Sequence, residues 1–140
     1  MADYFTQFSC ILDVGSPENA RRAVDLYQTL AVDLDHDDES QIGFLIDIIT
    51  DGGGSQLWIH DGGSGEPEHV IQFVRRCAEA FGLSGRWGFE WANTCSRPRL
   101  DAFGGGAHAI DLKTGETTSW VSTHEWLMLE LASDKADHLE

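Results

Sequence analysis

Two arginines lie close together in a chain that has few basic residues. Arg97 and Arg99 are two of only nine lysines and arginines, against 24 aspartates and glutamates. The planar guanidinium group binds carboxylates and phosphates in a two-pronged geometry, and Asn93 adds hydrogen-bonding groups a few positions earlier. This spacing predicts a site for a small anion, or for an acidic side chain of a partner, on a loop beside Trp91.

The same residues also have a purely structural interpretation. In so acidic a chain the two arginines could pair with the protein's own carboxylates, and Trp91 could pack in the core. The sequence Arg97-Pro98-Arg99 could form an extended connection, because the residue before a proline avoids helical geometry. The sequence leaves both interpretations open.

A thiol and two histidines in this region could form a nucleophile and its base. Cys95 would act as a thiolate if the fold brought His108 or His124 within hydrogen-bond distance. No spacing requires this, and an unreactive cysteine with a histidine packed on a strand face is the alternative. The candidate site residues are Trp91, Asn93, Cys95, Arg97, Arg99 and His108, with the catalytic residues left unassigned.

Two kinds of segment resemble cofactor motifs but lack a required residue. The acidic stretch 33–39 has carboxylates at the first, third and fifth positions of a calcium-binding EF-hand loop. That loop needs glycine at its sixth position and a bidentate acid at its twelfth, where this chain has Asp38 and Phe44. The glycine triplets at 52–54 and 104–106 lack the lysine of a phosphate-binding loop and the spacing of a dinucleotide site. We therefore expect a solvated acidic loop at 33–39, and neither a metal nor a cofactor.

The net charge argues against several classes of partner. A formal charge of −15 at pH 7 repels nucleic-acid phosphates and anionic membrane surfaces, so we expect neither direct nucleic-acid binding nor membrane binding. An acidic surface can keep a protein soluble, or it can imitate a nucleic acid and capture a basic protein. The three cysteines are widely spaced and odd in number, which favours free thiols and a cytoplasmic location.

Residue periodicity predicts one α+β domain over residues 1–138, with residues 139–140 resembling a cloning remnant. Alternation with a period of two indicates strands, and apolar spacings of three and four indicate helices. Ser122 and Glu125 match a capping box, which favours a final helix over the alternative of a strand. The expected strands are 8–14, 43–50, 56–60, 86–91, 107–112 and 117–121, the expected helices are 17–31, 67–82 and 123–132, and residues 92–106 are expected to form a loop.

The order of these elements predicts how the sheet is built. A βαββαβ order is typical of a ferredoxin-like core, so we expect a mainly antiparallel sheet followed by a β-hairpin and a C-terminal helix. Strand alternation places Trp87, Phe89 and Trp91 together on the buried face. It leaves Trp58 and Trp126 as tryptophans that could be exposed and anchor a partner.

Three hypotheses about function follow. The first is a non-enzymatic, acidic, cytoplasmic binding or adaptor protein, whose contact region is the 91–108 loop with the neighbouring sheet, and which binds a protein partner or forms a homo-oligomer. The second is a small enzyme or sensor that uses Cys95 and a histidine base on an anionic substrate. The third is a nucleic-acid mimic that binds a basic protein.

Overall fold

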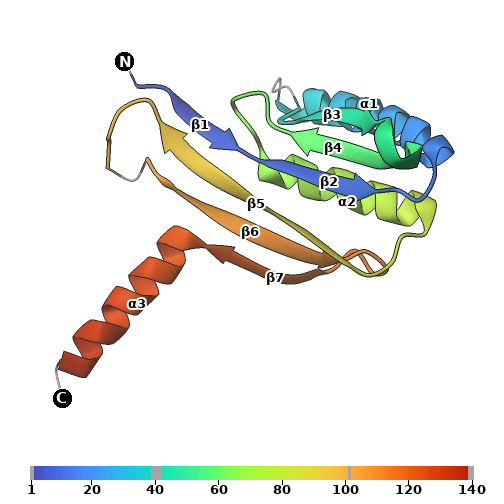
Figure 1. Cartoon of the computed structure of the whole chain (residues 1–140). Helices are drawn as coiled ribbons and strands as arrows, with labels where there is room; N and C mark the ends of the chain where they lie inside the picture. The colour runs from blue at the N-terminus through green and yellow to red at the C-terminus, as the bar shows by residue number, and fades with distance from the viewer. Residues whose placement is uncertain (1, 39–41, 101, 139–140) are drawn as a thin grey trace.

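The computed structural model describes residues 2–38, 42–100 and 102–138. Within these residues the chain is a mixed α+β structure with three α-helices and two antiparallel sheets (Figure 1), so the predicted fold class is confirmed. The elements are β1 (Tyr4–Gln7), β2 (Ser9–Asp13), α1 (Pro17–Asp38), β3 (Leu45–Ile49), β4 (Gln56–His60), α2 (Pro67–Phe81), β5 (Arg86–Cys95), β6 (Gly104–Asp111), β7 (Thr117–Ser122) and α3 (Thr123–His138), with a 3₁₀ turn at Asp51–Gly53.

The two sheets are joined by a continuous run of chain through β1 and β2. One sheet has the strand order β1-β5-β6-β7 and the other the order β2-β4-β3, and neighbouring strands are antiparallel. Only Phe8 separates β1 from β2, so the chain passes from one sheet to the other at this residue. The ferredoxin-like order is not confirmed by this topology, because the hydrogen-bonded strands divide into two sheets.

Helices α1 and α2 lie on one side of the sheets, and the hydrophobic core lies between the helices and the sheets (Figure 1). Apolar residues on each helix recur at three- and four-residue spacing and face the sheets. Each large apolar side chain that is fully buried stabilises the fold by roughly 1.5–3 kcal/mol. The largest fully buried side chains are Phe44, Phe73, Leu12, Leu30, Leu57, Ile59 and Ile110.

Most elements with a strong local pattern form where the sequence predicts them. β4 and α2 begin and end within a residue of the prediction. Gly115 adopts a φ of 77° in the turn between β6 and β7, as expected for a hairpin glycine. At the start of α3, the backbone N–H of Glu125 donates to the Ser122 hydroxyl at 3.4 Å, so the predicted helix is confirmed.

Two predicted boundaries near the N-terminus are wrong. Residues 4–7 form an additional strand, β1, because β5 extends far enough to pair with them. Helix α1 continues to Asp38 through the stretch expected to be an acidic loop. An ion pair between Arg76 Nη2 and Asp33 Oδ2, 3.0 Å apart, joins this extension to α2. Glu39 and the two residues set apart as a cloning remnant, 139–140, lie outside the described residues.

The prediction of a long loop at 92–106 is also wrong. β5 continues to Cys95 and β6 begins at Gly104, so the connection spans only residues 96–103. The sequence shows no alternation of apolar and polar residues here, because the glycines at 104–106 have no side chains. The strands nevertheless pair through Ala92–Gly105 and Asn93–Gly104.

Helix α3 projects away from the rest of the molecule at the end of β7 (Figure 1). Its first turn is joined to β6 by the Thr123 hydroxyl, which donates to the carbonyl oxygen of Gly105 at 3.3 Å. In the described part of the chain, no helix combines the length and the apolar character that crossing a membrane requires.

Candidate functional site

A pocket lies between the N-terminal end of α2 and the strands β5, β6 and β7. Its volume is about 550 Å³. The lining combines two carboxylates with aromatic side chains: Glu66, Pro67, Glu68 and Ile71 come from the start of α2, and Trp91, His108, Thr117 and Trp120 come from the sheet.

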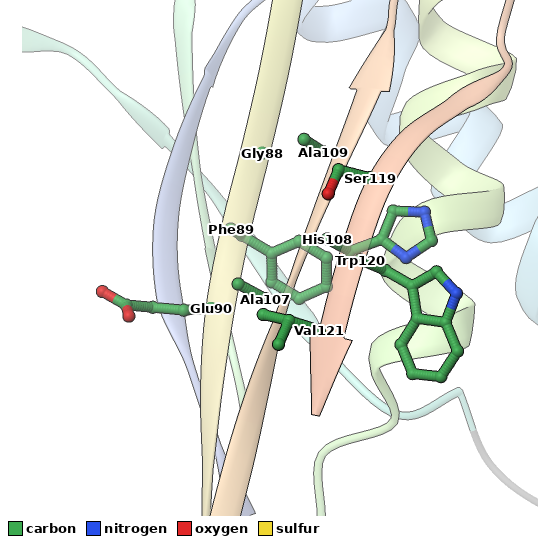
Figure 2. Close-up of a pocket in the computed structure, with 9 residues that line it drawn as sticks. All are labelled: Gly88, Phe89, Glu90, Ala107, His108, Ala109, Ser119, Trp120 and Val121. Atoms are coloured by element: carbon green, nitrogen blue, oxygen red, sulfur yellow. The ribbon is translucent and has the colours of Figure 1, made fainter. Parts of the chain in front are cut away.

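Strand register places the aromatic side chains of the pocket on one face of the sheet. His108 lies opposite Phe89 on β5 and opposite Trp120 on β7. Trp91 shares this face because it lies two residues after Phe89 on the same strand. Figure 2 shows His108 and Trp120 next to each other on the side of the strands where α2 lies, whereas Glu90 points to the opposite side.

Gly106 allows Trp91 to lie flat against the sheet. A Cβ atom at this position would come within 2.5 Å of Trp91 Cζ2 and within 2.6 Å of the carbonyl oxygen of Val121. Real carbon atoms do not approach so closely, so the indole ring occupies the space that a side chain would need. The absence of a side chain at Gly106 therefore fixes one wall of the pocket.

The start of α2 is held in place by the segment before β3. Gly43 donates its backbone N–H to His69 Nδ1 at 2.9 Å, and its carbonyl oxygen accepts from the backbone N–H of Glu66 at 2.8 Å. A Cβ atom on Gly43 would lie 2.2 Å from Glu66 Cβ, so this close approach requires glycine. Pro67 follows as the first helical residue. These contacts fix the position of Glu66 and Glu68 at the edge of the pocket.

A hydrogen-bond network supports the floor of the pocket. His108 Nε2 and the Thr117 hydroxyl lie 2.8 Å apart, and Arg75 Nη2 donates to the same hydroxyl at 3.1 Å. Arg75 Nε also donates to the carbonyl oxygen of Gly115 at 2.8 Å. Burial lowers the pKa of His108 below its ordinary 6.5, the nearby Arg75 lowers it further, and Glu68 opposes both effects. The imidazole is therefore neutral at pH 7.

The carboxylates and the indole rings of the pocket together favour a cationic ligand. Glu66 and Glu68 are exposed, and their two negative charges outweigh the single positive charge of Arg75, whose guanidinium group is already hydrogen-bonded. The faces of indole rings attract ammonium and guanidinium groups, and Trp91 and Trp120 line the same pocket. The arrangement can bind a cation between carboxylates and aromatic rings.

The sequence-predicted site residues divide into two groups. Trp91 and His108 both line the pocket. Asn93 lies further along β5, where its side-chain oxygen accepts from the Thr6 hydroxyl at 2.9 Å. Cys95 ends β5 opposite Tyr4. The structure therefore brings two of the predicted residues together and places Asn93 and Cys95 at the pairing between β1 and β5.

Arg97 and Arg99 lie on the connection between β5 and β6 and are both exposed. The connection is anchored to the N-terminal segment, because the backbone N–H of Ser96 donates to the carbonyl oxygen of Asp3 at 2.9 Å. Among the described residues, neither arginine forms an ion pair with a carboxylate. Neither lines the pocket.

Among the described residues, Cys95 forms no hydrogen bond to a histidine. His108 pairs with Phe89, six positions before Cys95 on the same strand, which corresponds to about 20 Å at roughly 3.3 Å per residue. No described hydrogen bond joins Cys95 to His108 or to His124. The other two thiols are protected from ionisation, since burial raises the pKa of both Cys10 and Cys77 from 9.0 to about 12.

Several pocket residues were missed by the sequence argument. Glu66 and Glu68 lie at the start of a predicted helix, where acids are common because they favour its positive end, so their positions in the sequence indicate no binding site. Trp120 is not among the tryptophans that the sequence pattern favours for exposure, but 56% of it is exposed. Its place next to His108 follows only from the β6–β7 register. The exposure predicted for Trp58 and Trp126 is confirmed, at 40% and 57%.

A shallow hollow of about 350 Å³ lies along the same three strands (Figure 2). Small residues contribute to it: Gly88, Ala107, Ala109 and Ser119.

Comparison with known proteins identifies no relative, because no family model, no curated protein and no solved structure matches this chain.

Proposed function

We propose that this protein is a non-enzymatic binding protein that captures a basic segment of a partner protein in the pocket between α2 and strands β5–β7. The observation that carries the proposal is that two exposed carboxylates, Glu66 and Glu68, line one pocket together with Trp91 and Trp120. Lysine and arginine side chains match both kinds of group, because carboxylates pair with their charge and indole faces attract it.

The charge of the whole molecule supports the same partner. A net charge of −15 accelerates the approach of a basic segment and slows that of an acidic one. Neutral His108 at the floor of the pocket adds no positive charge that would repel the guest. Specific recognition then depends on the aromatic rings, since the long-range attraction does not distinguish one basic segment from another.

This proposal keeps the adaptor hypothesis but moves its contact region from the 91–108 loop to the pocket, and it replaces the anionic or acidic ligand expected at that loop with a basic one. Trp91 and His108 remain in that region, whereas Arg97 and Arg99 lie outside the pocket. The enzyme hypothesis gains no support from the described hydrogen bonds, because none of them joins Cys95 to a histidine. A nucleic-acid mimic would also bind a basic protein, but its affinity would come from charge spread over a surface and would fall steeply with salt.

Calorimetric titration with a short arginine- and lysine-containing peptide tests the proposal. We expect the peptide to bind with a modest salt dependence and a peptide of the same length with glutamates in the basic positions not to bind. Glu66→Gln/Glu68→Gln should weaken binding about 10-fold or more, and Trp120→Leu about 2- to 5-fold, because a partly exposed cation–π contact contributes ~0.5–1 kcal/mol.

Glu90→Gln provides a matched control. It removes one carboxylate from the opposite side of the same strands (Figure 2) and should leave peptide affinity within about twofold of wild type. Equal weakening by Glu90→Gln and by the double variant would show that only general charge attraction acts, which contradicts a specific pocket. A basic peptide that fails to bind at low salt would exclude the proposal.

We also propose that the two sheets act as one ferredoxin-like core. If β1 and β2 are treated as one strand bent at Phe8, the spatial order becomes β3-β4-(β2, β1)-β5, which is the ferredoxin-like order with β6 and β7 added at one edge. In support, Trp87 Nε1 on β5 donates to the carbonyl oxygen of Ile11 on β2 at 2.9 Å and bridges the two sheets.

A further inference from the structure

Helix α3 exposes apolar side chains in every direction around its axis. Four consecutive residues, Trp126 to Leu129, point in four directions because successive residues of an α-helix are about 100° apart. The exposed large apolar residues of this helix are Trp126, Leu127, Met128, Leu129 and Leu131, with exposed fractions from 46% to 72%. A helix that is apolar all round is normally buried, and α3 projects from the body instead (Figure 1).

Strand β7, which leads into α3, has the features of a pairing edge. It is the last strand in the order β1-β5-β6-β7, so one of its edges has no strand partner among the described residues. Its sequence, Thr117–Ser122, contains no charged residue and no proline, which are the devices that usually protect an exposed edge. Trp120 and Val121 on this strand are 56% and 45% exposed.

We propose that β7 and α3 form the interface between two copies of this chain. The two β7 strands pair antiparallel across a twofold axis and join the two four-stranded sheets, and each α3 packs against the other copy. Antiparallel pairing of a strand with itself satisfies twofold symmetry, in which the same surface serves both partners.

The exposed area is of the order that such an interface needs. A standard interface removes roughly 800 Å² from each partner. Apart from Trp120, which lines the pocket, six large apolar side chains on β7 and α3 are 45% to 72% exposed, and they offer on the order of 600 Å² per chain. The pairing also avoids charge repulsion between two acidic molecules, because the residues that meet along β7 are uncharged.

A second copy fits this surface better than the basic partner of the pocket. Between Thr117 and Ser133 the acidic residues are Glu125 and Glu130, so a basic segment would meet few opposite charges there. A second copy brings an apolar surface of the same extent. The inference does not depend on the proposed function, because it rests on the free edge of β7 and on α3. The pocket shares only Thr117 and Trp120 with β7 and takes no residue from α3.

Light scattering coupled to size exclusion tests the inference on the full chain. We expect wild-type protein at micromolar concentration to have twice the 15.5 kDa chain mass, and Leu127→Glu/Leu129→Glu to have the mass of a single chain. Leu45→Glu is the matched control, because Leu45 is also about half exposed, at 47%, but lies on β3. It should remain a dimer.

Three results would overturn the inference: a wild-type monomer at 100 micromolar, a dimer that survives Leu127→Glu/Leu129→Glu, or open-ended assemblies of mixed mass. Hydrogen exchange on wild-type protein provides a test that needs no variant. Protection of residues 117–131 should fall on dilution, while protection of α2 stays constant, and concentration-independent protection would contradict the dimer. The monomeric variant should still bind the basic peptide, so failure of the dimer and failure of the pocket can be told apart.

Discussion

His108 sets the charge at the floor of the pocket near neutral pH. Burial first, and then Arg75, lower its pKa below 6.5, against the opposing effect of Glu68. A lowered histidine pKa means that the folded protein favours the neutral ring. The stability that the ring contributes is therefore present above pH 6.5 and is lost as the pH falls through the lowered value.

Binding of the basic peptide should weaken as the pH falls from 7 through the lowered pKa of His108, because protonated His108 places a positive charge beside the cationic guest. In His108→Gln the weakening over this range should largely disappear, since glutamine cannot titrate. Calorimetric affinities for both proteins at a series of pH values provide the check. Equal weakening in the two proteins would assign the effect to the carboxylates instead.

At the scale of elements, local patterns were sufficient wherever the chain determines its own conformation. The alternation in β4, the apolar stripe of α2 and the turn glycine Gly115 each led to the observed structure. β1 could not be found in this way, because Tyr4–Gln7 has weak alternation and becomes a strand only when β5 pairs with it.

The candidate site was predictable only in part for a related reason. Trp91 and His108 were identified by residue type and by closeness in sequence. Glu68 joins them from a helix that starts 41 residues before His108, and only packing of α2 on the sheet creates that contact. Exposure of Trp120 likewise depends on what covers β7, which strand alternation does not specify.

The connection between β5 and β6 allows a direct test of the original arginine site. Arg97→Ala/Arg99→Ala should leave the free energy of unfolding within about 0.5 kcal/mol of wild type, because both side chains are exposed. Affinity for the basic peptide should be unchanged or slightly higher, since two positive charges are removed. Urea unfolding and calorimetry measure the two quantities. A loss of affinity beyond about threefold would show that the connection between β5 and β6 is part of the peptide-binding site.

For the whole molecule, the distribution of exposed side chains separates two kinds of surface. Carboxylates lie with tryptophans at the pocket, whereas β7 is uncharged and the first turns of α3 expose large apolar side chains. The first suits a charged guest and the second suits a second copy, so one acidic chain can dimerise and still leave a pocket for a basic partner. The two-state stability of such a dimer depends on protein concentration, and stability measurements must hold that concentration fixed.

Stability should decrease at alkaline pH because two thiols are buried in the fold. Burial raises the pKa of Cys10 and Cys77 from 9.0 to about 12, so unfolded chains release these protons near pH 9 while the folded protein retains them. Their contribution is complete below pH 9 and is lost as the pH rises toward 12. Urea unfolding between about pH 8 and about pH 11 should show this slope, and Cys10→Ala/Cys77→Ala should flatten it although it lowers stability at pH 7 by ~1–3 kcal/mol. Cys95→Ala is the control, because it leaves Cys10 and Cys77 in place, and it should retain the wild-type slope. An undiminished slope in the double variant would assign the alkaline transition to other groups, such as Tyr27, whose pKa burial also raises.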